Sequence, residues 1–435
     1  MAGQDWVRHA LWWQVYPLGF VGAEQHALPP GSDPVHRLRD MIGWLDYVVE
    51  LGASGIALGP VFSAETHGYD TVDYFTIDPR LGDDADFDAL VAAAHQRGLR
   101  VLLDGVFNHV GRGFPAFQQV LAQGRDAATA PWFHLTWPGP GYRDFEGHHH
   151  LVALNHDAPA VVEHVTKVMT HWLDRGADGW RLDAAYEVPS AFWHAVLPAV
   201  RAAHPQAYIV GEVIHGDYTA AVREGGLDSV TQYELWKAIW SSLNDGNFFE
   251  LSASLDRHNA LLETFAPLTF VGNHDVTRIA SRLEDPRFLP HALAILFTVG
   301  GTPSVYYGDE QGFRGVKEDR VGGDDAVRPP FPAGPEGLAP AGWQVYRLHR
   351  ELIAVRRRHP WLHRARTEVL QLANERILYR TSEETPGAEQ ALNVALNLSS
   401  EPAEFALPGQ LAVVAGAAGT NGKLTLPPGG WAILE

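Results

Sequence analysis

The strongest constraint on the fold is a repeated alternation of short apolar runs and amphipathic helical stretches. The first run, Leu11–Tyr16, is followed by Pro34–Leu51, in which apolar residues recur every three or four positions. That spacing predicts a helix with one buried face. Asp84–Arg97 repeats the helical pattern and leads into the apolar run Arg100–Leu103. Strands alternating with helices predict a parallel sheet that is covered by helices.

The alternation continues to about residue 360, which sets the number of strands. Seven strands are clear from their apolar runs, and spacing alone places the sixth in chain order near Leu227–Thr231. The other strands are Gly55–Leu58, Gly179–Leu182, Ala207–Gly211, Leu268–Val271 and Pro303–Tyr307. The other helices are Ala160–Asp174, Ser190–Ala203, His291–Val299 and Trp343–Arg357. So many units in a chain of 435 residues predict a closed (β/α)8 TIM barrel.

One interval is too long for a barrel unit and predicts an insertion. The third strand ends near Asp104 and the fourth near Asp183, so the residues after strand three are expected to form an inserted domain B. Long loops at the carboxyl ends of barrel strands usually build the active site. From Trp361 onward, short alternating apolar runs predict an antiparallel β domain. The expected boundaries are 1–106 and 158–360 for the barrel, 107–157 for domain B and 361–435 for a C-terminal β-sandwich, domain C.

Composition and charge restrict the partners and the compartment. Lys+Arg 33 against Asp+Glu 52 gives a net charge of −19, which disfavours nucleic acid and anionic membrane surfaces. The chain has no cysteine, which excludes disulfides and thiolate sites and favours the cytoplasm. The N-terminus lacks a basic start followed by an apolar run, and no apolar stretch approaches the ~20 residues of a membrane span. We therefore expect no signal peptide, and a monomer or homodimer in the cytoplasm.

Charged side chains gather at the expected carboxyl ends of the strands. Asp104 ends the third strand, Arg181 and Asp183 end the fourth, Glu212 ends the fifth, and Asp275 follows the seventh. The 29 residues from Asp183 to Glu212 match one barrel unit, and the 63 residues on to Asp275 match two. Carboxylates clustered on one face are hard to explain as packing, because like charges repel. The spacing therefore predicts a catalytic cluster at the mouth of the barrel.

Three carboxylates without a cysteine nucleophile, a phosphate loop or a zinc motif favour glycosyl chemistry. Cleavage of a glycoside needs one protonated carboxyl for the leaving oxygen and one ionised carboxylate for the developing oxocarbenium ion. Arg181 lies two residues before Asp183 in a strand, so both side chains point the same way, and the cation is expected to keep Asp183 ionised. Glu212 is then expected to be the proton donor, with a pKa raised by burial.

Six segments of the sequence together resemble one enzyme family. DGVFNH, GWRLDAAYE, GEV and FVGNHD follow one another between Asp104 and Asp275. LVALNHD begins at Leu151, and GTPSVYYGDEQG begins at Gly301. These segments are similar to the signature regions of glycoside hydrolase family 13, the α-amylase family, over the barrel, domain B and domain C. The resemblance implies a retaining hydrolase that cleaves α-1,4-glucosidic bonds by double displacement.

The resemblance implies a role for each matching position. Asp183 corresponds to the nucleophile, Glu212 to the general acid/base, and Asp275 to the third carboxylate, which stabilises the transition state. The positions implied to bind the sugar at subsite −1 are Tyr69, His109, Arg181 and His274. Asp70 and Asp104 are implied to hold these sugar-binding side chains in place without contacting the sugar.

Two segments resemble the cyclomaltodextrinases, neopullulanases and maltogenic amylases of that family. They are the ALN of LVALNHD and GGDDAVRPPF, and the second implies that Asp325 and Arg328 bind the sugar at subsite −2. The implied substrates are small cyclic, branched or linear malto-oligosaccharides. Tyr186 and Ile214 depart from the subgroup, which favours Asn and Trp there, whereas Glu187 keeps the acidic residue near the plus subsites. The first strand begins near residue 11, so we do not expect the N-terminal domain of this subgroup.

Several alternatives stay open at this point. The chain can be an α-glucosidase or a transglycosylase of the same family, because sequence does not fix how well an acceptor sugar competes with water. An inactive sugar-binding member is a remote alternative, since all three carboxylates are present. No cofactor is expected to be required. Asn108 corresponds to a calcium-contacting position in many α-amylases, so calcium there stays open, and the run His148–His150 is interpreted as a solvated loop.

Overall fold

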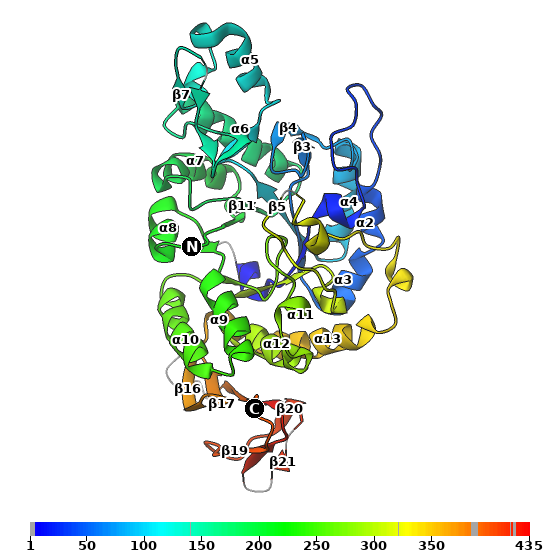
Figure 1. The fold of residues 1–435 in the computed structure, drawn as a ribbon, viewed down its shortest axis with the longest axis vertical. Helices are drawn as coiled ribbons and strands as arrows, with labels where there is room; N and C mark the ends of the chain where they lie inside the picture. The colour runs from blue at the N-terminus through cyan, green and yellow to red at the C-terminus, as the bar shows by residue number, and fades with distance from the viewer. Residues whose placement is uncertain (1–4, 140, 321, 384–389, 418, 421–422) are drawn as a thin grey trace.

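Eight parallel strands form a closed barrel at the centre of the molecule (Figure 1). The computed structural model describes residues 5–139, 141–320, 322–383, 390–417, 419–420 and 423–435. The barrel strands are β1 (Trp12–Val15), β2 (Gly55–Leu58), β5 (Arg100–Gly105), β11 (Gly179–Leu182), β12 (Tyr208–Gly211), β13 (Ser229–Val230), β14 (Leu268–Thr269) and β15 (Thr302–Tyr306). Their order is β13-β12-β11-β5-β2-β1-β15-β14, and a parallel bridge from Thr231 to Leu268 joins the two ends. The TIM-barrel prediction is confirmed.

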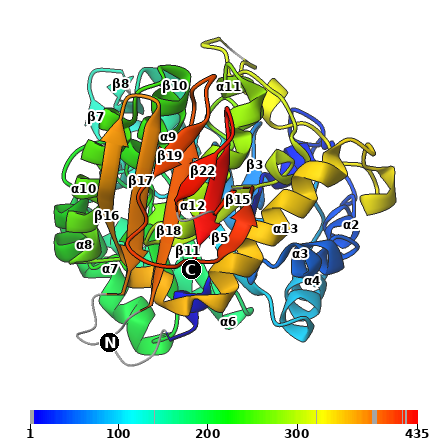
Figure 2. The same cartoon turned by 90° about the horizontal axis from the view of Figure 1, so that it is seen from below.

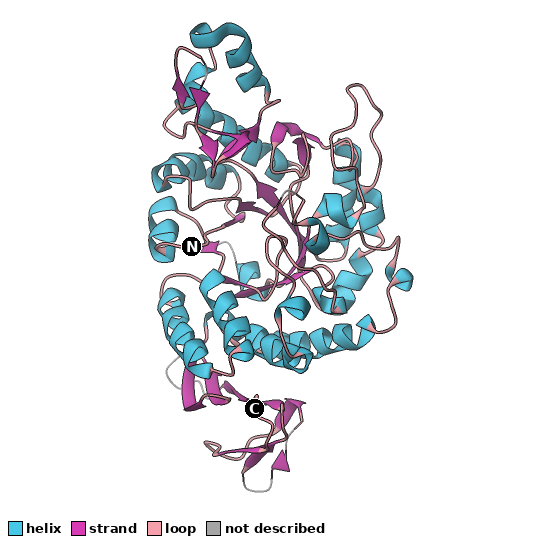
Figure 3. Cartoon of the chain, viewed as in Figure 1, coloured by secondary structure: helices cyan, strands magenta, loops and turns pink. Residues whose placement is uncertain are grey.

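Helices surround this barrel on its outer side (Figure 3). They are α2 (Leu38–Ile42), α3 (Leu45–Leu51), α4 (Asp84–Gln96), α6 (Pro159–Asp174), α7 (Ser190–Ala203), α8 (Tyr218–Gly225), α9 (Tyr233–Asn244), α10 (Phe248–Leu262), α12 (Leu289–Thr298) and α13 (Gly342–Arg358). Two further short helices, α1 (Pro17–Phe20) and α11 (Ile279–Arg282), follow β1 and β14. Because the strands are parallel, all their carboxyl ends lie at one mouth of the barrel.

The single helix expected over Pro34–Leu51 is wrong in its extent. The structure has α2 and α3, separated by a turn at Gly43 and the buried Trp44. Before α2, the backbone N–H of Val35 donates to the carbonyl of Pro79 at 2.8 Å. Long-range backbone partners of this kind replace helical hydrogen bonds at the start of the segment, which periodicity alone does not reveal.

Domain B leaves the barrel after β5 and returns to it at α6. Its elements are β6 (His109–Gly111), α5 (Pro115–Gln123), β7 (Leu135–Thr136), β8 (Gly141–Tyr142), β9 (Asp144–Phe145) and β10 (His148–Ala153). Strand β10 pairs antiparallel with β6 on one side and with β9 on the other. Figure 1 shows this insertion at the top of the molecule, beside the strands β3 (Phe62–Ala64) and β4 (Thr71–Ile77). The exact boundaries of domain B stay a prediction.

The C-terminal part is an antiparallel β domain, as expected. It contains β16 (Arg366–Ala373), β17 (Arg376–Ser382), β18 (Ala391–Asn397), β19 (Ala403–Phe405), β20 (Val413–Gly416), β21 (Gly419–Thr420), β22 (Leu424–Leu426) and β23 (Trp431–Leu434). A five-stranded sheet has the order β16-β17-β18-β23-β20, and a second sheet has the order β19-β22-β21. Seen from below, strands β16, β17 and β18 lie side by side across the barrel helices (Figure 2). This domain lies at the opposite end of the molecule from domain B.

Apolar side chains fill the space between barrel and helices. Trp172, Trp180 and Trp193 are fully buried there, and they account for part of the high tryptophan content. Among the described residues, none of the helices combines the length and the apolar character needed to span a membrane.

Candidate active site

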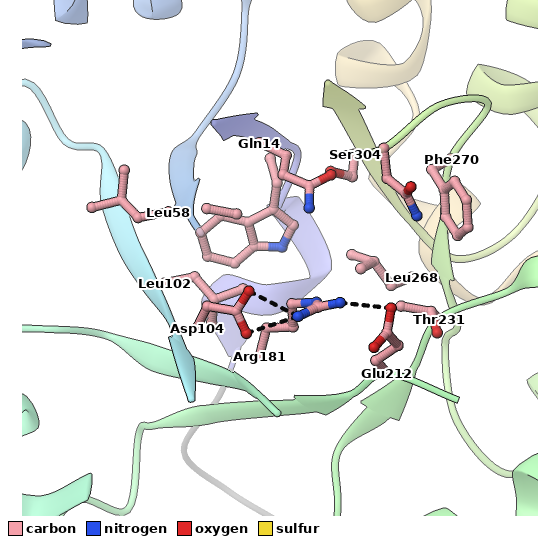
Figure 4. A pocket seen from close by; sticks show the side chains of 13 residues that line it. Gln14, Leu58, Leu102, Asp104, Arg181, Glu212, Thr231, Leu268, Phe270 and Ser304 are labelled. Carbon is pink, nitrogen blue, oxygen red and sulfur yellow. Dashed lines mark hydrogen bonds and ion pairs between the residues drawn. The ribbon is translucent and has the colours of Figure 1, made fainter. Parts of the chain in front are cut away.

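One arginine, Arg181, joins three carboxylates at the mouth of the barrel, and Figure 4 shows its contacts with two of them, Asp104 and Glu212. Arg181 lies on β11, where the parallel register pairs it with Asp104 of β5. Its Nη1 donates to both oxygens of Asp104 at 2.8 Å and to Oδ1 of Asp183 at 3.1 Å. Its Nη2 lies 2.6 Å from Oε1 of Glu212. All four side chains are buried, and the structure brings them together at this point.

Glu212 has two further hydrogen-bond donors. The backbone N–H of Ala184 donates to its Oε2 at 3.0 Å, and the hydroxyl of Tyr233 donates to its Oε1 at 3.1 Å. Asn273 in turn donates to the hydroxyl oxygen of Tyr233 at 2.9 Å. Ala184 has φ 44°, a left-handed conformation that is unfavourable for a residue other than glycine. The bond to Glu212 offsets part of this backbone strain and fixes the turn directly after Asp183.

Asp275 is surrounded by cationic and aromatic groups on the other side of the mouth. Nη2 of Arg328 donates to its Oδ1 at 2.9 Å, and Nε2 of His274 lies 2.9 Å from its Oδ2. Nε of Arg328 also donates to the backbone carbonyl of His274 at 3.0 Å. The hydroxyl of Tyr69 contacts Nε2 of His274 and donates to Asp104 at 3.2 Å, which links the two sides.

The remaining residues expected at subsite −1 lie around Tyr69. The ring of His274 is parallel to the ring of Tyr69, with centroids 5.5 Å apart. Nε2 of His109 lies 3.1 Å from the backbone carbonyl of Tyr69, and Phe145 of domain B stacks on the His109 ring at 4.6 Å. Asp70 is buried and accepts a hydrogen bond from the backbone N–H of Thr66, which holds the loop that carries Tyr69.

The two sides of the mouth shift carboxyl acidity in opposite directions. Burial raises the pKa of Asp183 well above its ordinary value, and the charges of Glu212 and Asp104 add to this effect against the opposing Arg181. Burial also acts on Asp275, but the charge and hydrogen bond of His274 and the charges of Arg328 and Arg181 bring its pKa below the ordinary range. The expectation that Arg181 alone keeps Asp183 ionised therefore needs revision, because this guanidinium is shared among three carboxylates.

The chain that carries these site residues is similar in sequence to proteins of one known family. A family model described as "Alpha amylase, catalytic domain" matches residues 14–336. The chain belongs to the α-amylase family, glycoside hydrolase family 13. A cyclomaltodextrinase of Geobacillus thermopakistaniensis (strain MAS1) is 33% identical over 436 residues, which cover 93% of this chain and 71% of that protein. The chain covers 58% and 60% of the lengths of two further curated family members.

Solved structures of the family match the whole chain. The cyclic α-maltosyl-(1→6)-maltose hydrolase of Arthrobacter globiformis, in complex with cyclic α-maltosyl-(1→6)-maltose, has a TM-score of 0.83 and 29% identity and covers 100% of both chains. The acarbose-soaked debranching enzyme of Nostoc punctiforme has a TM-score of 0.83 and 28% identity, with 99% of each chain covered.

Two of the family-implied positions, Glu187 and Asp325, contact residues other than the three carboxylates. Glu187 lies 3.6 Å from Nη2 of Arg143 in domain B. Asp325 is exposed, and its Oδ2 is 3.4 Å from the side-chain nitrogen of Gln25. Asp324, one residue earlier, is the carboxylate that lies 3.1 Å from Arg328. The sugar contact at subsite −2 that the resemblance implies for Asp325 stays a prediction.

Other contacts of the site were not visible in the sequence. Tyr233 and Asn273 support Glu212, and the side-chain nitrogen of Gln14 lies 3.2 Å from Nδ1 of His274. Asn273 stands beside His274 in FVGNHD, so the motif itself was an available signal. Tyr233 and Gln14 come from other barrel units, and no local pattern marks them.

Calcium at Asn108, which the sequence leaves open, has little support from the surrounding side chains. The amide nitrogen of Asn108 lies 3.1 Å from Nδ1 of His109. Within the described ranges, the one group of three ligating side chains that could share an ion is His36, Asp83 and Asp86. Asp86 in this group also accepts from Arg39 and from the backbone N–H of Asp83. Calcium needs six to eight oxygen ligands, and Asn108 offers one.

Proposed function

We propose that the protein is a retaining hydrolase that cleaves α-1,4-glucosidic bonds in small cyclic, branched or linear malto-oligosaccharides. The single observation that carries this proposal is the guanidinium of Arg181, which contacts both Asp183 and Glu212. Two carboxyls that share one guanidinium suit the separation of about 5–5.5 Å found in retaining glycosidases better than the wider gap of inverting ones. A cytoplasmic location, expected from the absence of cysteine, is part of this proposal.

The reaction uses the two carboxyl groups in two steps. In the first step Asp183 attacks the anomeric carbon, while Glu212 donates its proton to the glycosidic oxygen as that bond breaks. In the second step Glu212 removes a proton from water, and the resulting nucleophile displaces Asp183 from the same carbon. Two inversions retain the configuration of the anomeric carbon.

The Arg181 cluster keeps a proton available for this chemistry. Asp104, Asp183 and Glu212 carry three negative charges when ionised, whereas Arg181 supplies one positive charge. The excess negative charge favours retention of a proton by the cluster, which titrates as a unit. A glycosidic oxygen beside Glu212 accepts a hydrogen bond from the protonated form, so bound substrate favours the proton on Glu212 and an ionised Asp183.

The other side of the mouth provides a fixed negative charge. Asp275 is held ionised by His274 and Arg328, so it is suited to accept hydrogen bonds from sugar hydroxyls and to stabilise the positive charge of the transition state. Tyr69, His109 and His274 form an aromatic and polar wall suited to the sugar at subsite −1. The names of the relatives, which include cyclomaltodextrinase and cyclic α-maltosyl-(1→6)-maltose hydrolase, support this substrate class.

The role of each carboxyl is tested by comparing maltotetraose with α-maltosyl fluoride, whose fluoride leaves without protonation. We expect Glu212→Gln to lower turnover of maltotetraose by at least about 10²–10⁴-fold and first-step turnover of the fluoride much less. We expect Asp183→Asn to abolish both reactions and to prevent formation of a trapped glycosyl adduct, measured by mass spectrometry. An adduct on another residue, or β-maltose as the first product in NMR, would contradict the proposal.

A product profile separates hydrolysis from transfer. Released maltose and glucose, without longer products, identify a hydrolase, whereas products longer than the substrate identify a transglycosylase. No contact in the site favours transfer over hydrolysis by itself.

A further inference from the structure

Basic side chains gather at the amino end of the barrel, which is the end opposite the proposed active site. The short helix η1 (Asp5–His9) leads into β1, and η8 (Pro360–Arg364) follows the end of α13. The strands of a barrel begin where its outer helices end, so both segments lie at this end. Nη1 of Arg357, in the last turn of α13, donates to the backbone carbonyl of His9 at 2.9 Å and joins the two regions.

A small cavity lies between these segments, and we call it the basic cavity. Its volume is about 20 Å³. Among the described residues that line it, none is acidic, and most are basic. The basic residues of its lining are Arg8, His9, Arg356, Arg357, His359 and His363. This cavity therefore reverses locally the sign of the overall charge of the chain, which is −19.

Backbone contacts explain the position of Arg356 but not its charge. This side chain is 8% exposed, and its guanidinium donates to the backbone carbonyls of Phe297, Val299 and Gly301. Carbonyl groups are neutral, so they satisfy the donors without compensating the buried positive charge. Burial lowers the pKa of Arg356 to about 9, and the charge of Arg357 adds to this effect. An anion beside these two arginines would supply the compensating charge.

The histidines of the cavity are subject to the same repulsion. Burial, followed by the charges of Arg356 and Arg364, lowers the pKa of His363 to about 3. Burial and the charge of Arg8 also lower the pKa of His9. A bound anion would act in the opposite direction, because a negative charge nearby stabilises the cationic form of each neighbour.

The dipole of α13 accounts for only part of this cluster. Arg356 and Arg357 lie in the last turn of the helix, where a positive charge is favourable. His359 follows the helix, and its Nε2 lies 3.2 Å from Oε1 of Glu435. The other basic residues of the cavity belong to η1 and η8. Another reason is therefore needed for their position beside the two arginines.

A second cavity, which we call the side cavity, begins at the same basic residues. Its volume is about 250 Å³, and it shares Arg8 and His363 with the basic cavity. Apolar side chains form much of its remaining lining, and Tyr208 and Thr264 add hydroxyl groups. The other charged residues of its lining are Asp5, Asp228 and Arg364. The side cavity thus suits an uncharged body that carries hydroxyl groups, and the basic cavity suits a charged end.

We propose that the amino end of the barrel binds a phosphorylated sugar, with its phosphate group at Arg8 and the basic cavity and its sugar ring in the side cavity. Guanidinium groups suit phosphate because they offer several donors in one plane. The basic cavity is too small for a whole ligand but has room for a phosphate oxygen. This inference goes beyond the proposed function and does not rest on it, because the site lies at the other end of the barrel from the catalytic carboxyls.

Binding is tested by isothermal titration calorimetry with glucose 6-phosphate, inorganic phosphate and glucose at constant ionic strength. We expect a Kd of about 1 mM or lower for glucose 6-phosphate, about fivefold weaker binding of phosphate, and no measurable binding of glucose at this site. Constant ionic strength removes the general effect of screening. Heat from glucose 6-phosphate no larger than that from sodium chloride would overturn the inference.

The place of binding is tested with two arginine variants. Arg8 is exposed and lines both cavities, so Arg8→Gln removes a charge of the site without changing the core. We expect this variant to bind both phosphate ligands at least about fivefold more weakly and to keep wild-type activity on maltotetraose. Arg347→Gln removes an exposed arginine nearer the start of α13 and is the matched control, with a change of less than about twofold. Equal weakening in both variants would overturn the site.

The role of the side cavity is tested with a variant that fills it. Val222 of α8 lines this cavity, so Val222→Phe is expected to weaken glucose 6-phosphate about fivefold and to leave inorganic phosphate unchanged. Circular dichroism checks that the variant is folded. Equal affinity of the wild type for phosphate and glucose 6-phosphate would overturn the placement of the sugar ring. Competitive inhibition of maltotetraose hydrolysis by glucose 6-phosphate, with an inhibition constant equal to its Kd, would place the ligand at the active site and overturn the inference.

Discussion

The two sides of the barrel mouth use the same residue types in opposite proportions. On one side a single guanidinium, Arg181, is shared by Asp104, Asp183 and Glu212. On the other side a single carboxylate, Asp275, is shared by Arg328 and His274. In the first arrangement three carboxylates share one guanidinium, whereas in the second one guanidinium and one imidazole contact Asp275, and that guanidinium also lies 3.1 Å from Asp324.

This difference in proportion accounts for the opposite pKa shifts. Burial raises the pKa of Asp183 because Arg181 cannot satisfy three carboxylates, whereas the neighbours of Asp275 overcome burial and lower its pKa. Burial therefore does not explain the difference between the pKa values of Asp183 and Asp275, since both carboxyls are buried. The charges and hydrogen bonds around each carboxyl decide which side can hold and pass a proton and which side keeps a permanent charge.

The largest expected effect follows from removing the shared cation. Arg181→Gln leaves three buried carboxylates without a positive charge, so their pKa values rise and the ionised nucleophile is lost. We expect kcat to fall about 10³-fold or more on maltotetraose and on α-maltosyl fluoride alike. We also expect the pH optimum to move to higher pH, because the pKa values of the carboxyls rise. Circular dichroism and thermal melting check that the variant is folded. Arg181→Lys keeps the positive charge but not the planar set of guanidinium donors, so it should recover part of the activity. A pH optimum that stays in place would contradict the shared-proton interpretation.

A smaller effect is expected from the same change on the other side. Arg328→Gln removes the guanidinium partner of Asp275, and the contact with His274 remains. The pKa of Asp275 rises but stays below that of Asp183, so the nucleophile still controls the acidic limb of the pH profile. We expect kcat/KM to fall about tenfold with no change of the pH optimum, measured on maltotetraose between pH 4 and 9. If Arg328→Gln moved the optimum as far as Arg181→Gln, the two sides would not differ as described.

The smallest effect on activity is expected at a buried carboxyl outside the mouth, whose hydrogen-bond partners are neutral and whose change affects stability instead. Glu310 accepts from the hydroxyl of Tyr47 and from the backbone N–H of Gly308, both at 2.9 Å. Burial raises its pKa from the ordinary 4.5 to about 7. The folded state thus keeps a proton that the unfolded chain releases, so the stabilisation present below pH 4.5 is lost as the pH rises to about 7.

The change in the free energy of unfolding is on the order of 3 kcal/mol for this group. Glu310→Gln cannot ionise, so its melting temperature should exceed that of the wild type more at pH 7.5 than at pH 5, with catalytic activity as the control. A difference in melting temperature that is the same at both pH values would show that Glu310 does not titrate in this range.

The elements of the barrel were largely predictable from local pattern. Gly179–Leu182 and Ser190–Ala203 have the expected bounds, and Tyr208–Gly211 differs from the expected strand by one residue. Short apolar runs in a parallel sheet are buried on both faces, so their hydrophobicity identifies them directly. The segment from 34 to 51 was harder, because its backbone bonds to Pro79 and Leu81 come from another part of the chain.

The sequence predicted which residues belong to the candidate site better than it predicted the contacts between them. The order of strands places Asp104, Asp183 and Glu212 at one mouth, since parallel strands end on the same side of a barrel. The contact of Asp324 with Arg328 was not predicted, because it depends on how a loop without regular periodicity folds. The bond between Tyr186 and Glu146 joins two units that are 40 residues apart, and no local spacing encodes it.

By itself the sequence determined the barrel, its two added domains and the residues that end its strands, because these follow from hydrophobic period and chain order. Only the tertiary structure decided how many cations each carboxylate meets, and hence which carboxyl holds a proton and which stays charged. Acidity in a buried site depends on distances between side chains from different strands, and those distances exist only once the barrel has closed.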